Sequence, residues 1–200
     1  MRSVLLFLLA LATVYTTCLA VNVPPGWRIY DSPDRGFILA YPKDFKLYPD
    51  STKAQLSVIP ICDEATIACF EYSGSEYNGT RLEAAGIAVN IVSGARTEEE
   101  CSKIDTGQFP IKSAIINGIH FHYGETGGAA AGNVIGGPAY RTFHNHVCFE
   151  LALRVATDNT SHDDSGIVLQ FDSTKLEMRL KKILYTFRFV DHSARRAGSE

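Results

Sequence analysis

The chain has 200 residues, of which 46% are hydrophobic and 20% charged, a composition that suits one globular domain and excludes a chain disordered by composition. Its 19 basic residues stand against 22 acidic ones, a formal net charge of −3, so it lacks the basic excess that binding nucleic acid by charge requires. We therefore expect a single domain whose unknown partner is a protein or a small molecule.

The first twenty residues have the pattern of a secretory signal peptide. Arg2 precedes an apolar run at residues 4–12 that is too short to span a bilayer. Cleavage after Ala20 would place two small residues, Cys18 and Ala20, where signal peptidase requires them. The competing interpretation, a lipid anchor on Cys18, lacks the lipobox residues at positions 15–17. We expect a mature chain that is secreted or periplasmic and has no transmembrane segment.

Removal of residues 1–20 changes the cysteine count from five to four. In an oxidising compartment four cysteines are expected to form two disulfides, for which three connectivities are possible. The favoured pairing joins Cys62 to Cys69, which flank one short loop, and Cys101 to Cys148, which lie far apart in the sequence. A cysteine zinc site would need closely spaced pairs, and the sequence contains none.

Hydrophobic alternation and turn residues predict short strands in the first half of the mature chain. They are expected at residues 27–30, 36–42, 54–61, 67–73 and 86–92, with a turn at 31–34. Capping-box spacing predicts a helical turn at 80–83 and a short helix that begins after Thr97 and carries Cys101 and Ile104.

Two hairpins are expected in the second half. Asn117 and Gly118 separate strands at 112–116 and 119–125, and both residue types accept the positive φ of a two-residue turn. This register places His120 and His122 on the face opposite Phe121. A second hairpin over 140–156 would turn at Asn145 and His146. Its register predicts three cross-strand pairs: Arg141 with Glu150, Tyr140 with Leu151, and Phe143 with Cys148.

The segment between these hairpins, residues 127–138, is rich in glycine and alanine. It lacks the strand–loop–helix context of a phosphate-binding loop, so a mobile connection or a weakly paired strand is expected. After a polar loop at 158–165, a helix is expected to begin at Asp172 or Ser173. Its apolar residues recur at helical spacing: Leu176, Leu180, Ile183, Leu184 and Phe187.

The histidines carry the sharpest chemical hypothesis. His120 and His122 alternate on one strand, so both imidazoles can reach one metal ion, and His144 on a neighbouring strand could add a third. Zinc or copper would suit such a site, although surface histidines without a metal are the simpler interpretation. His146 is needed for the hairpin turn and is left out of this set.

We assign no catalytic residue and expect no cofactor. The sequence contains no nucleophile elbow, and its Ser161–Asp164 run has the composition of a solvated loop. The acidic residues 98–100 are interpreted as helix-capping charges. Asn78 and Asn159 begin glycosylation sequons, whose use depends on the organism.

The order of these elements resembles the PsbP-like group of small α/β proteins. An early strand of that group has a Gly-Phe-x-x-x-Tyr-Pro pattern, matched here by Gly36, Phe37, Tyr41 and Pro42, and the chain closes on an amphipathic helix that ends at 183–189. The likeness covers most of residues 27–190. It implies an antiparallel sheet flanked by helices and a non-enzymatic accessory or binding role.

These features predict an α+β fold: an antiparallel β-sheet of hairpins, with a C-terminal amphipathic helix packed on one face and one or two short helices. The domain is expected to span residues 21–190, between a signal peptide at 1–20 and a flexible tail at 191–200. The expected function is that of an exported, disulfide-stabilised, non-enzymatic binding or accessory protein. The alternative is a metal-dependent secreted enzyme or metal-binding protein that uses the histidine cluster.

Overall fold

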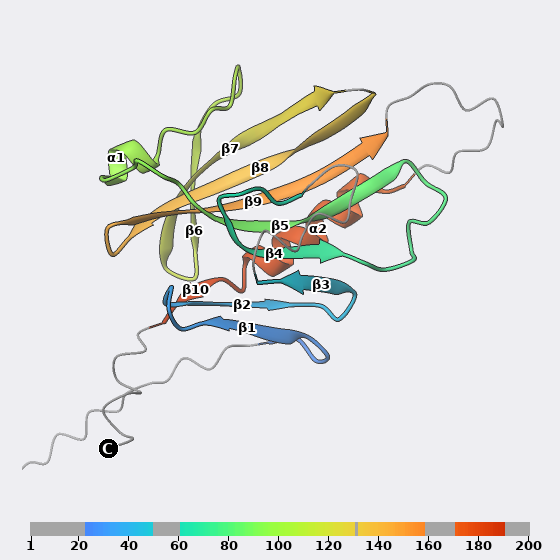
Figure 1. The fold of residues 1–200 in the computed structure, drawn as a ribbon, viewed down its shortest axis with the longest axis horizontal. Coiled ribbons are helices and arrows are strands. Elements are labelled where there is room, and N and C mark those ends of the chain that lie inside the picture. The colour runs from blue at the N-terminus through green and yellow to red at the C-terminus, as the bar shows by residue number, and fades with distance from the viewer. Residues whose placement is uncertain (1–22, 50–60, 131, 159–170, 191–200) are drawn as a thin grey trace, which may run out of the picture.

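The computed structural model describes residues 23–49, 61–130, 132–158 and 171–190 (Figure 1). Several expectations concern residues outside these ranges: the signal peptide, Cys18, residues 54–60 of the strand expected over 54–61, the loop after Asp158, Asn159 and the tail at 191–200. No helix among the described residues is long and apolar enough to cross a membrane.

The described residues form ten strands and two helices. In chain order they are β1 (Arg28–Ser32), β2 (Phe37–Tyr41), β3 (Phe45–Tyr48), β4 (Thr66–Tyr72), β5 (Leu82–Ile91), α1 (Glu98–Cys101), β6 (Lys112–Ile116), β7 (Ile119–Ala130), β8 (Asn133–His144), β9 (Val147–Asp158), α2 (Ser173–Leu184) and β10 (Arg188–Phe189).

The strands of the described residues make two antiparallel sheets. The larger has the order β3-β4-β5-β9-β8-β7-β6, and the smaller has the order β1-β2-β10. Figure 1 shows the smaller sheet beside the larger one, with α2 next to β5 and β9, which it contacts together with β2. The fold is therefore α+β and is dominated by antiparallel sheet.

The two faces of the larger sheet are covered differently. Because successive side chains of a strand point to opposite faces, Val89 and Leu151 share one face, which we call the helix face. Asn90 and Glu150 share the other, which we call the disulfide face. The main core lies on the helix face and joins residues of both sheets and α2: Phe37, Leu39, Ile87, Val89, Leu151, Leu153, Leu180, Ile183, Leu184 and Phe187.

Helix α2 begins after Asp172, whose carboxylate accepts a hydrogen bond from the Lys175 backbone N–H at 3.0 Å. On its outer side Lys181 pairs with Glu177 at 2.6 Å, four residues apart. The buried residues of the helix are Leu176, Leu180, Ile183 and Leu184. The helix ends at Leu184, so Phe187, which the spacing had included in it, enters the core from the segment that follows.

Two tight turns set the register of the hairpins. Asn117 and Gly118 have φ values of 51° and 78°, and Asn145 and His146 have values of 49° and 62°. All four lie in the left-handed region that a two-residue hairpin turn requires, as predicted. The Asn117 side chain also donates to the carbonyls of Tyr185 and Phe187, at 2.7 and 2.9 Å, which joins the β6–β7 turn to the segment after α2.

Other local predictions were wrong or incomplete. Residues 80–83 form no helical turn, because the Thr80 hydroxyl accepts from the backbone N–H of Leu82 and strand β5 begins there. Strand β3 was not predicted. Strand β1 runs through Ser32, so the turn that the sequence predicts at 31–34 begins only after Ser32.

The glycine-rich segment is a paired hairpin, the second of the two interpretations given for it. Strands β7 and β8 stay in register through this segment, where Gly127 lies opposite Gly136. A Cβ atom at Gly127 would collide with the backbone of Ile135 and Gly136, which explains the need for glycine there.

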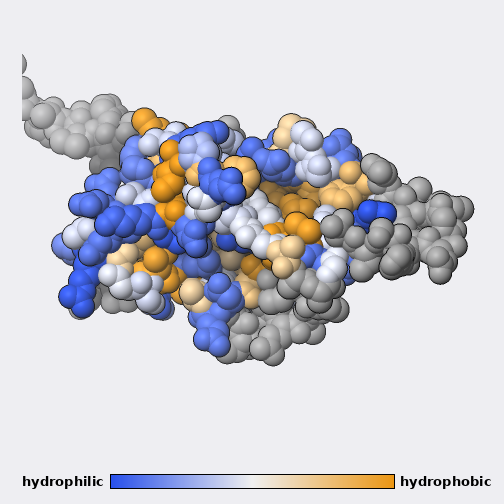
Figure 2. All heavy atoms as spheres, turned by 90° about the horizontal axis from the view of Figure 1, so that it is seen from above, coloured by the Kyte–Doolittle hydropathy of each residue, from blue (hydrophilic) through white to orange (hydrophobic). Residues whose placement is uncertain are grey.

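Exposed hydrophobic residues are scattered over the surface. In the view of Figure 2 they appear as separate groups between hydrophilic residues. The large exposed hydrophobic side chains of the described residues are Ile29, Phe109, Ile111, Ile115, Val134, Met178 and Tyr185. Single exposed residues of this kind are normal in soluble domains. A functional site is therefore better sought in a hollow or a side-chain cluster than on a broad apolar face.

Candidate ligand-binding site

A row of polar residues crosses the disulfide face of the larger sheet. In the register of the strands each member lies opposite the next, and we call this set the polar row: Thr66, Asn90, Glu150, Arg141, His122 and Ser113. The row runs from β4 to β6 and therefore connects the centre of the sheet with the histidine-bearing strand β7.

Hydrogen bonds link the central members of the polar row. The Thr66 hydroxyl donates to Asn90 Oδ1 at 2.8 Å, and Asn90 Nδ2 donates to Glu150 Oε1 at 3.1 Å. Arg141 Nε donates to Glu150 Oε2 at 2.7 Å. The Arg141 and Glu150 side chains are 17% and 11% exposed, so this ion pair is largely removed from water. Both carboxylate oxygens have a donor, which offsets the desolvation of the buried charge.

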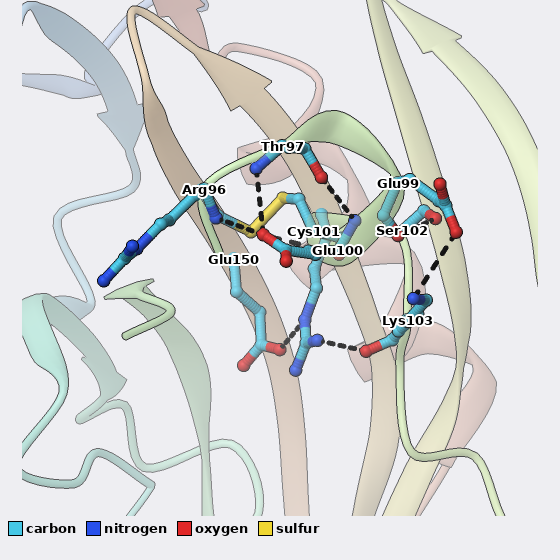
Figure 3. The surroundings of a disulfide bond; sticks show 10 residues. Arg96, Thr97, Glu99, Glu100, Cys101, Ser102, Lys103 and Glu150 are labelled. Atoms are coloured by element: carbon cyan, nitrogen blue, oxygen red, sulfur yellow. Dashed lines mark hydrogen bonds and ion pairs between the residues drawn. A yellow bond between two sulfur atoms is a disulfide. The ribbon is translucent and has the colours of Figure 1, made fainter. Parts of the chain in front are cut away.

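The structure contains two disulfides, with the pairing that the spacing favours. Cys62 is bonded to Cys69 of β4, with Cα atoms 6.0 Å apart, and Cys101 of α1 is bonded to Cys148 of β9, with Cα atoms 5.5 Å apart. The second bond fixes the one-turn helix α1 on the disulfide face of the sheet (Figure 3).

Helix α1 begins with the capping box that its sequence predicts. The Thr97 hydroxyl accepts from the Glu100 backbone N–H at 3.2 Å, and the Glu100 carboxylate accepts from the backbone N–H groups of Arg96 and Thr97, at 2.7 and 3.2 Å. The hydrogen bond from Arg96 holds the pKa of Glu100 below its ordinary value.

The segment after α1 is also attached to the polar row. The Lys103 carbonyl accepts a hydrogen bond from Arg141 Nη1 at 2.6 Å, whereas Glu150 accepts from Nε of the same guanidinium. Residues 98–103 are thus held on the sheet by the disulfide of Cys101 and by this hydrogen bond.

The structure brings His120 and His122 together but places His144 elsewhere. The rings of His120 and His122 are 4.8 Å apart, and His120 Nδ1 lies 3.9 Å from Glu98 Oε1 of α1. One ligand atom from each of Glu98, His120 and His122 lies within 4.8 Å of the others. His144 instead stacks on Phe189 of β10, with ring centroids 3.8 Å apart and planes at 11°.

The separation of His144 follows from the register. His122 lies opposite Arg141, so Arg141 shares its face of the sheet, and His144, three residues further along β8, points to the opposite face. Burial of the imidazole lowers the pKa of His144 from its ordinary value of 6.5. His146 occupies the β8–β9 turn, as its positive φ requires.

A pocket of about 710 Å³ adjoins this cluster, where α1, the β6–β7 turn, the end of β8 and strand β10 meet. It combines aromatic, polar and charged side chains. The lining residues are Glu98, Asn117, Gly118, Ile119, His120, Thr142, Phe143, His144, Arg188, Phe189 and Val190. Although His120 and His144 belong to different faces of the sheet, both border this pocket at the strand ends.

Glu98 is the member of the cluster that is not among the predicted site residues. Its sequence context predicts a helix-capping charge, as for Glu99 and Glu100. That interpretation holds for Glu100, while Glu99 contacts Lys103 at 3.5 Å. A cysteine three residues after Glu98 was the available signal, because pairing of Cys101 with Cys148 brings α1 to the sheet.

No family model matches the chain, and no curated protein matches its sequence. Solved structures with a similar fold include cyanobacterial PsbP from Synechocystis sp. PCC 6803, 9% identical, with 82% of this chain and 92% of that chain covered and a TM-score of 0.45. The Saccharomyces cerevisiae Ran-binding protein Mog1p is 14% identical, with 84% and 97% covered and a TM-score of 0.46.

A crystal structure from Bacteroides thetaiotaomicron is 13% identical, with 83% of this chain covered and a TM-score of 0.49, and the match spans 49% of that chain. The resemblance to PsbP-like proteins that the sequence motifs indicated is thus present among the structural matches. At these identities the likeness concerns the fold.

Proposed function

We propose that this chain is an exported, disulfide-stabilised binding protein that holds a small planar molecule in the pocket beside His120 and catalyses no reaction. The observation that carries the proposal is the pocket itself. Its volume of about 710 Å³ lies within the roughly 300–1,000 Å³ that is typical of small-molecule sites. A mixture of aromatic walls with a few polar groups is also typical of such sites.

The character of the lining favours a planar ligand. Phe143 from β8 and Phe189 from β10 supply aromatic surface, and His144 already stacks on Phe189. Aromatic rings bind other rings by stacking or edge contacts. Glu98 and Arg188 place opposite charges on the same lining, which suits a ligand that carries polar substituents.

The walls of the pocket are fixed by bonds to other parts of the fold. The Asn117 side chain joins the β6–β7 turn to the segment before β10, and β10 pairs with β2. The disulfide of Cys101 holds α1. A site whose walls are ordered before binding loses less entropy when it takes up a ligand.

The expected compartment agrees with this proposal. Two disulfides are compatible with an extracellular or periplasmic protein, where such bonds persist. The N-terminal sequence, with its apolar run and small residues before position 21, is the reason to propose export by a cleaved signal peptide.

The test is a binding experiment monitored by NMR. Indole, benzoate and benzamidine serve as neutral, anionic and cationic planar probes, and at least one is expected to shift the backbone amides of Gly118, Ile119 and His120 in a saturable way. Phe143→Ala should weaken that binding because it removes an aromatic wall. Phe109→Ala is the matched control, since Phe109 is 61% exposed and lies outside the pocket.

Two outcomes would contradict the proposal. If none of the three probes shifts the pocket amides, the pocket is not a site for planar molecules. If the protein instead turns over an ester, glycoside or phosphate substrate and Phe143→Ala abolishes that turnover, the chain is an enzyme.

The second candidate function, metal binding, is favoured by a separate observation. Glu98, His120 and His122 offer three ligand atoms within 4.8 Å of one another. This set replaces the one expected from the sequence, in which His144 was the third member.

A further inference from the structure

The two histidines of β7 are presented to the same side of the sheet. His120 and His122 alternate along the strand, so both imidazoles point to the disulfide face, where their rings lie 4.8 Å apart. Their neighbours across the strand pair with β6 are Ile115 and Ser113, which carry no charge. Ile115 and Ser113 therefore place no positive charge beside the imidazole nitrogens that would oppose the binding of a metal cation.

A carboxylate approaches these histidines from a different element. The three glutamates of α1 contact different partners. Glu100 caps the helix and Glu99 contacts Lys103, whereas Glu98 Oε1 lies 3.9 Å from His120 Nδ1. The side chains of Glu98 and His120 are 70% and 49% exposed, so both retain the freedom to adjust to a ligand.

The geometry points to a Zn²⁺ site formed by Glu98, His120 and His122. Two imidazoles and one carboxylate are a ligand set that zinc uses in proteins, with a further position left for water or another ligand. Tetrahedral bonds of about 2.0–2.1 Å separate the ligand atoms by roughly 3.3 Å. The present atoms lie within 4.8 Å, so side-chain rotations that close about 1.5 Å would complete the site.

Arg141 is the positively charged residue nearest to His122 in the strand register. Its charge does not repel a metal ion as a free charge would, because it is paired with Glu150. Arg141 lies opposite His122, but its guanidinium is engaged by the Glu150 carboxylate at 2.7 Å and by the Lys103 carbonyl at 2.6 Å. The ion pair compensates its charge, and both bonds direct the guanidinium toward β9 and α1.

The position of Glu98 depends on a disulfide. Helix α1 has one turn, with Glu98 at its first residue and Cys101 at its last, and Cys101 is bonded to Cys148 of the sheet. An isolated helix of this length is not stable, so this bond holds the carboxylate near the histidines. Loss of the Cys101–Cys148 bond would leave a weaker two-histidine site.

The zinc proposal does not rest on the proposed planar ligand, although Glu98 and His120 belong to both the zinc site and the pocket lining. The test uses the full chain, expressed with its own N-terminus, without a tag, and purified without chelators. Competition with a chromophoric zinc chelator should give one zinc ion per chain. Replacement by Co²⁺ should give the visible absorption of a tetrahedral site.

Variants of the three ligands identify the site. Glu98→Gln, His120→Asn and His122→Asn should each weaken zinc binding by tenfold or more, since even indirect support of a ligand is worth about 10–100-fold in metal affinity. Glu99→Gln and His146→Asn are the matched controls and should retain the affinity of the unchanged chain. Asparagine suits the positive φ at position 146.

The role of the Cys101–Cys148 disulfide is tested with two double variants, each of which removes one of the two disulfides. Cys101→Ser/Cys148→Ser should reduce zinc affinity to that of Glu98→Gln, whereas Cys62→Ser/Cys69→Ser should leave it unchanged. Circular dichroism verifies that each variant is folded. If either cysteine double variant fails to fold, the surface variant Glu98→Gln still tests whether Glu98 binds zinc.

The inference is overturned if zinc does not bind with one-to-one stoichiometry, if Glu98→Gln binds zinc as tightly as the unchanged chain, or if His144→Asn weakens binding as much as His120→Asn. None of these results depends on the planar probes. Failure of the probes with intact zinc binding, or the reverse, therefore separates the two proposals.

Discussion

Removal of the Arg141 guanidinium is predicted to be one of the most damaging single changes on the disulfide face. Arg141→Met keeps most of the aliphatic length but deletes the ion pair with Glu150 at 2.7 Å and the bond to the Lys103 carbonyl at 2.6 Å. The Glu150 carboxylate, 11% exposed, then keeps a single side-chain donor, Asn90 Nδ2 at 3.1 Å. Breaking a buried pair in this way costs about 3–5 kcal/mol of unfolding free energy.

A second substitution separates the charge from the packing. In Arg141→Met/Glu150→Gln no buried charge remains, and the glutamine amide oxygen still accepts the bond from Asn90. The double variant should therefore lose only about 1–2 kcal/mol, the cost of the hydrogen bonds that are not replaced. The difference from the sum of the two single variants measures the coupling of the pair.

The assay is equilibrium unfolding in urea with both disulfides intact, followed by the fluorescence of Trp27, the one tryptophan of the sequence, and by circular dichroism. Lys103→Met is the control, because its backbone carbonyl remains and its side chain, 68% exposed, makes an exposed ion pair that contributes little. The reasoning is refuted if Arg141→Met costs no more than Lys103→Met, or if the double variant is as unstable as the sum of its parts.

Two further predictions concern other parts of the sheet. Gly86→Ala should cost about 1–3 kcal/mol in a urea titration, because a Cβ there would collide with the Phe70 carbonyl, whereas Gly128→Ala, whose Cβ meets nothing within 4 Å, should be nearly neutral. Burial lowers the pKa of His144 below 6.5, so the unfolded chain binds more protons, and stability should fall as the pH drops below that value. His144→Asn should reduce this dependence, and an NMR titration that finds the pKa of His144 at or above 6.5 would contradict it.

The two hairpins with turns at Asn117-Gly118 and Asn145-His146 could be predicted because the residues of each turn determine how the strands pair. A two-residue turn needs left-handed φ at both positions, and Asn117-Gly118 and Asn145-His146 supply residues that accept it. Once the turn is placed, cross-strand partners follow by counting, as for Phe143 and Cys148. Alternation then assigns each side chain to a face.

The position of His144 relative to His120 and His122 could not be predicted, because it depends on the pairing of β7 with β8. The glycine-rich segment contains few side chains that show alternation, so the sequence allows a weakly paired strand there but does not fix its register. Its register places Arg141, rather than His144, on the face of His122. Strand β3, with four residues, is likewise too short for a periodic pattern to be distinguished from a turn.

The position of Glu98 near His120 depends on contacts between residues that lie far apart in the sequence. The neighbours of Glu98 predict a capped helix, and they are correct about the helix. Its position near His120 arises from a bond between residues 47 positions apart and from the register of two hairpins. No window of sequence around Glu98 contains these facts.

The proposed zinc site and the polar row are mechanically connected through residues 98–103. The Cys101–Cys148 bond holds this segment at the end of α1, and the Arg141 bond to the Lys103 carbonyl holds it two residues later. Arg141 owes its orientation to Glu150, which Asn90 orients in turn. The buried pair therefore does more than stabilise the sheet: it fixes the segment that carries Glu98, so weakening the pair should loosen the carboxylate while leaving His120 and His122 in place on β7.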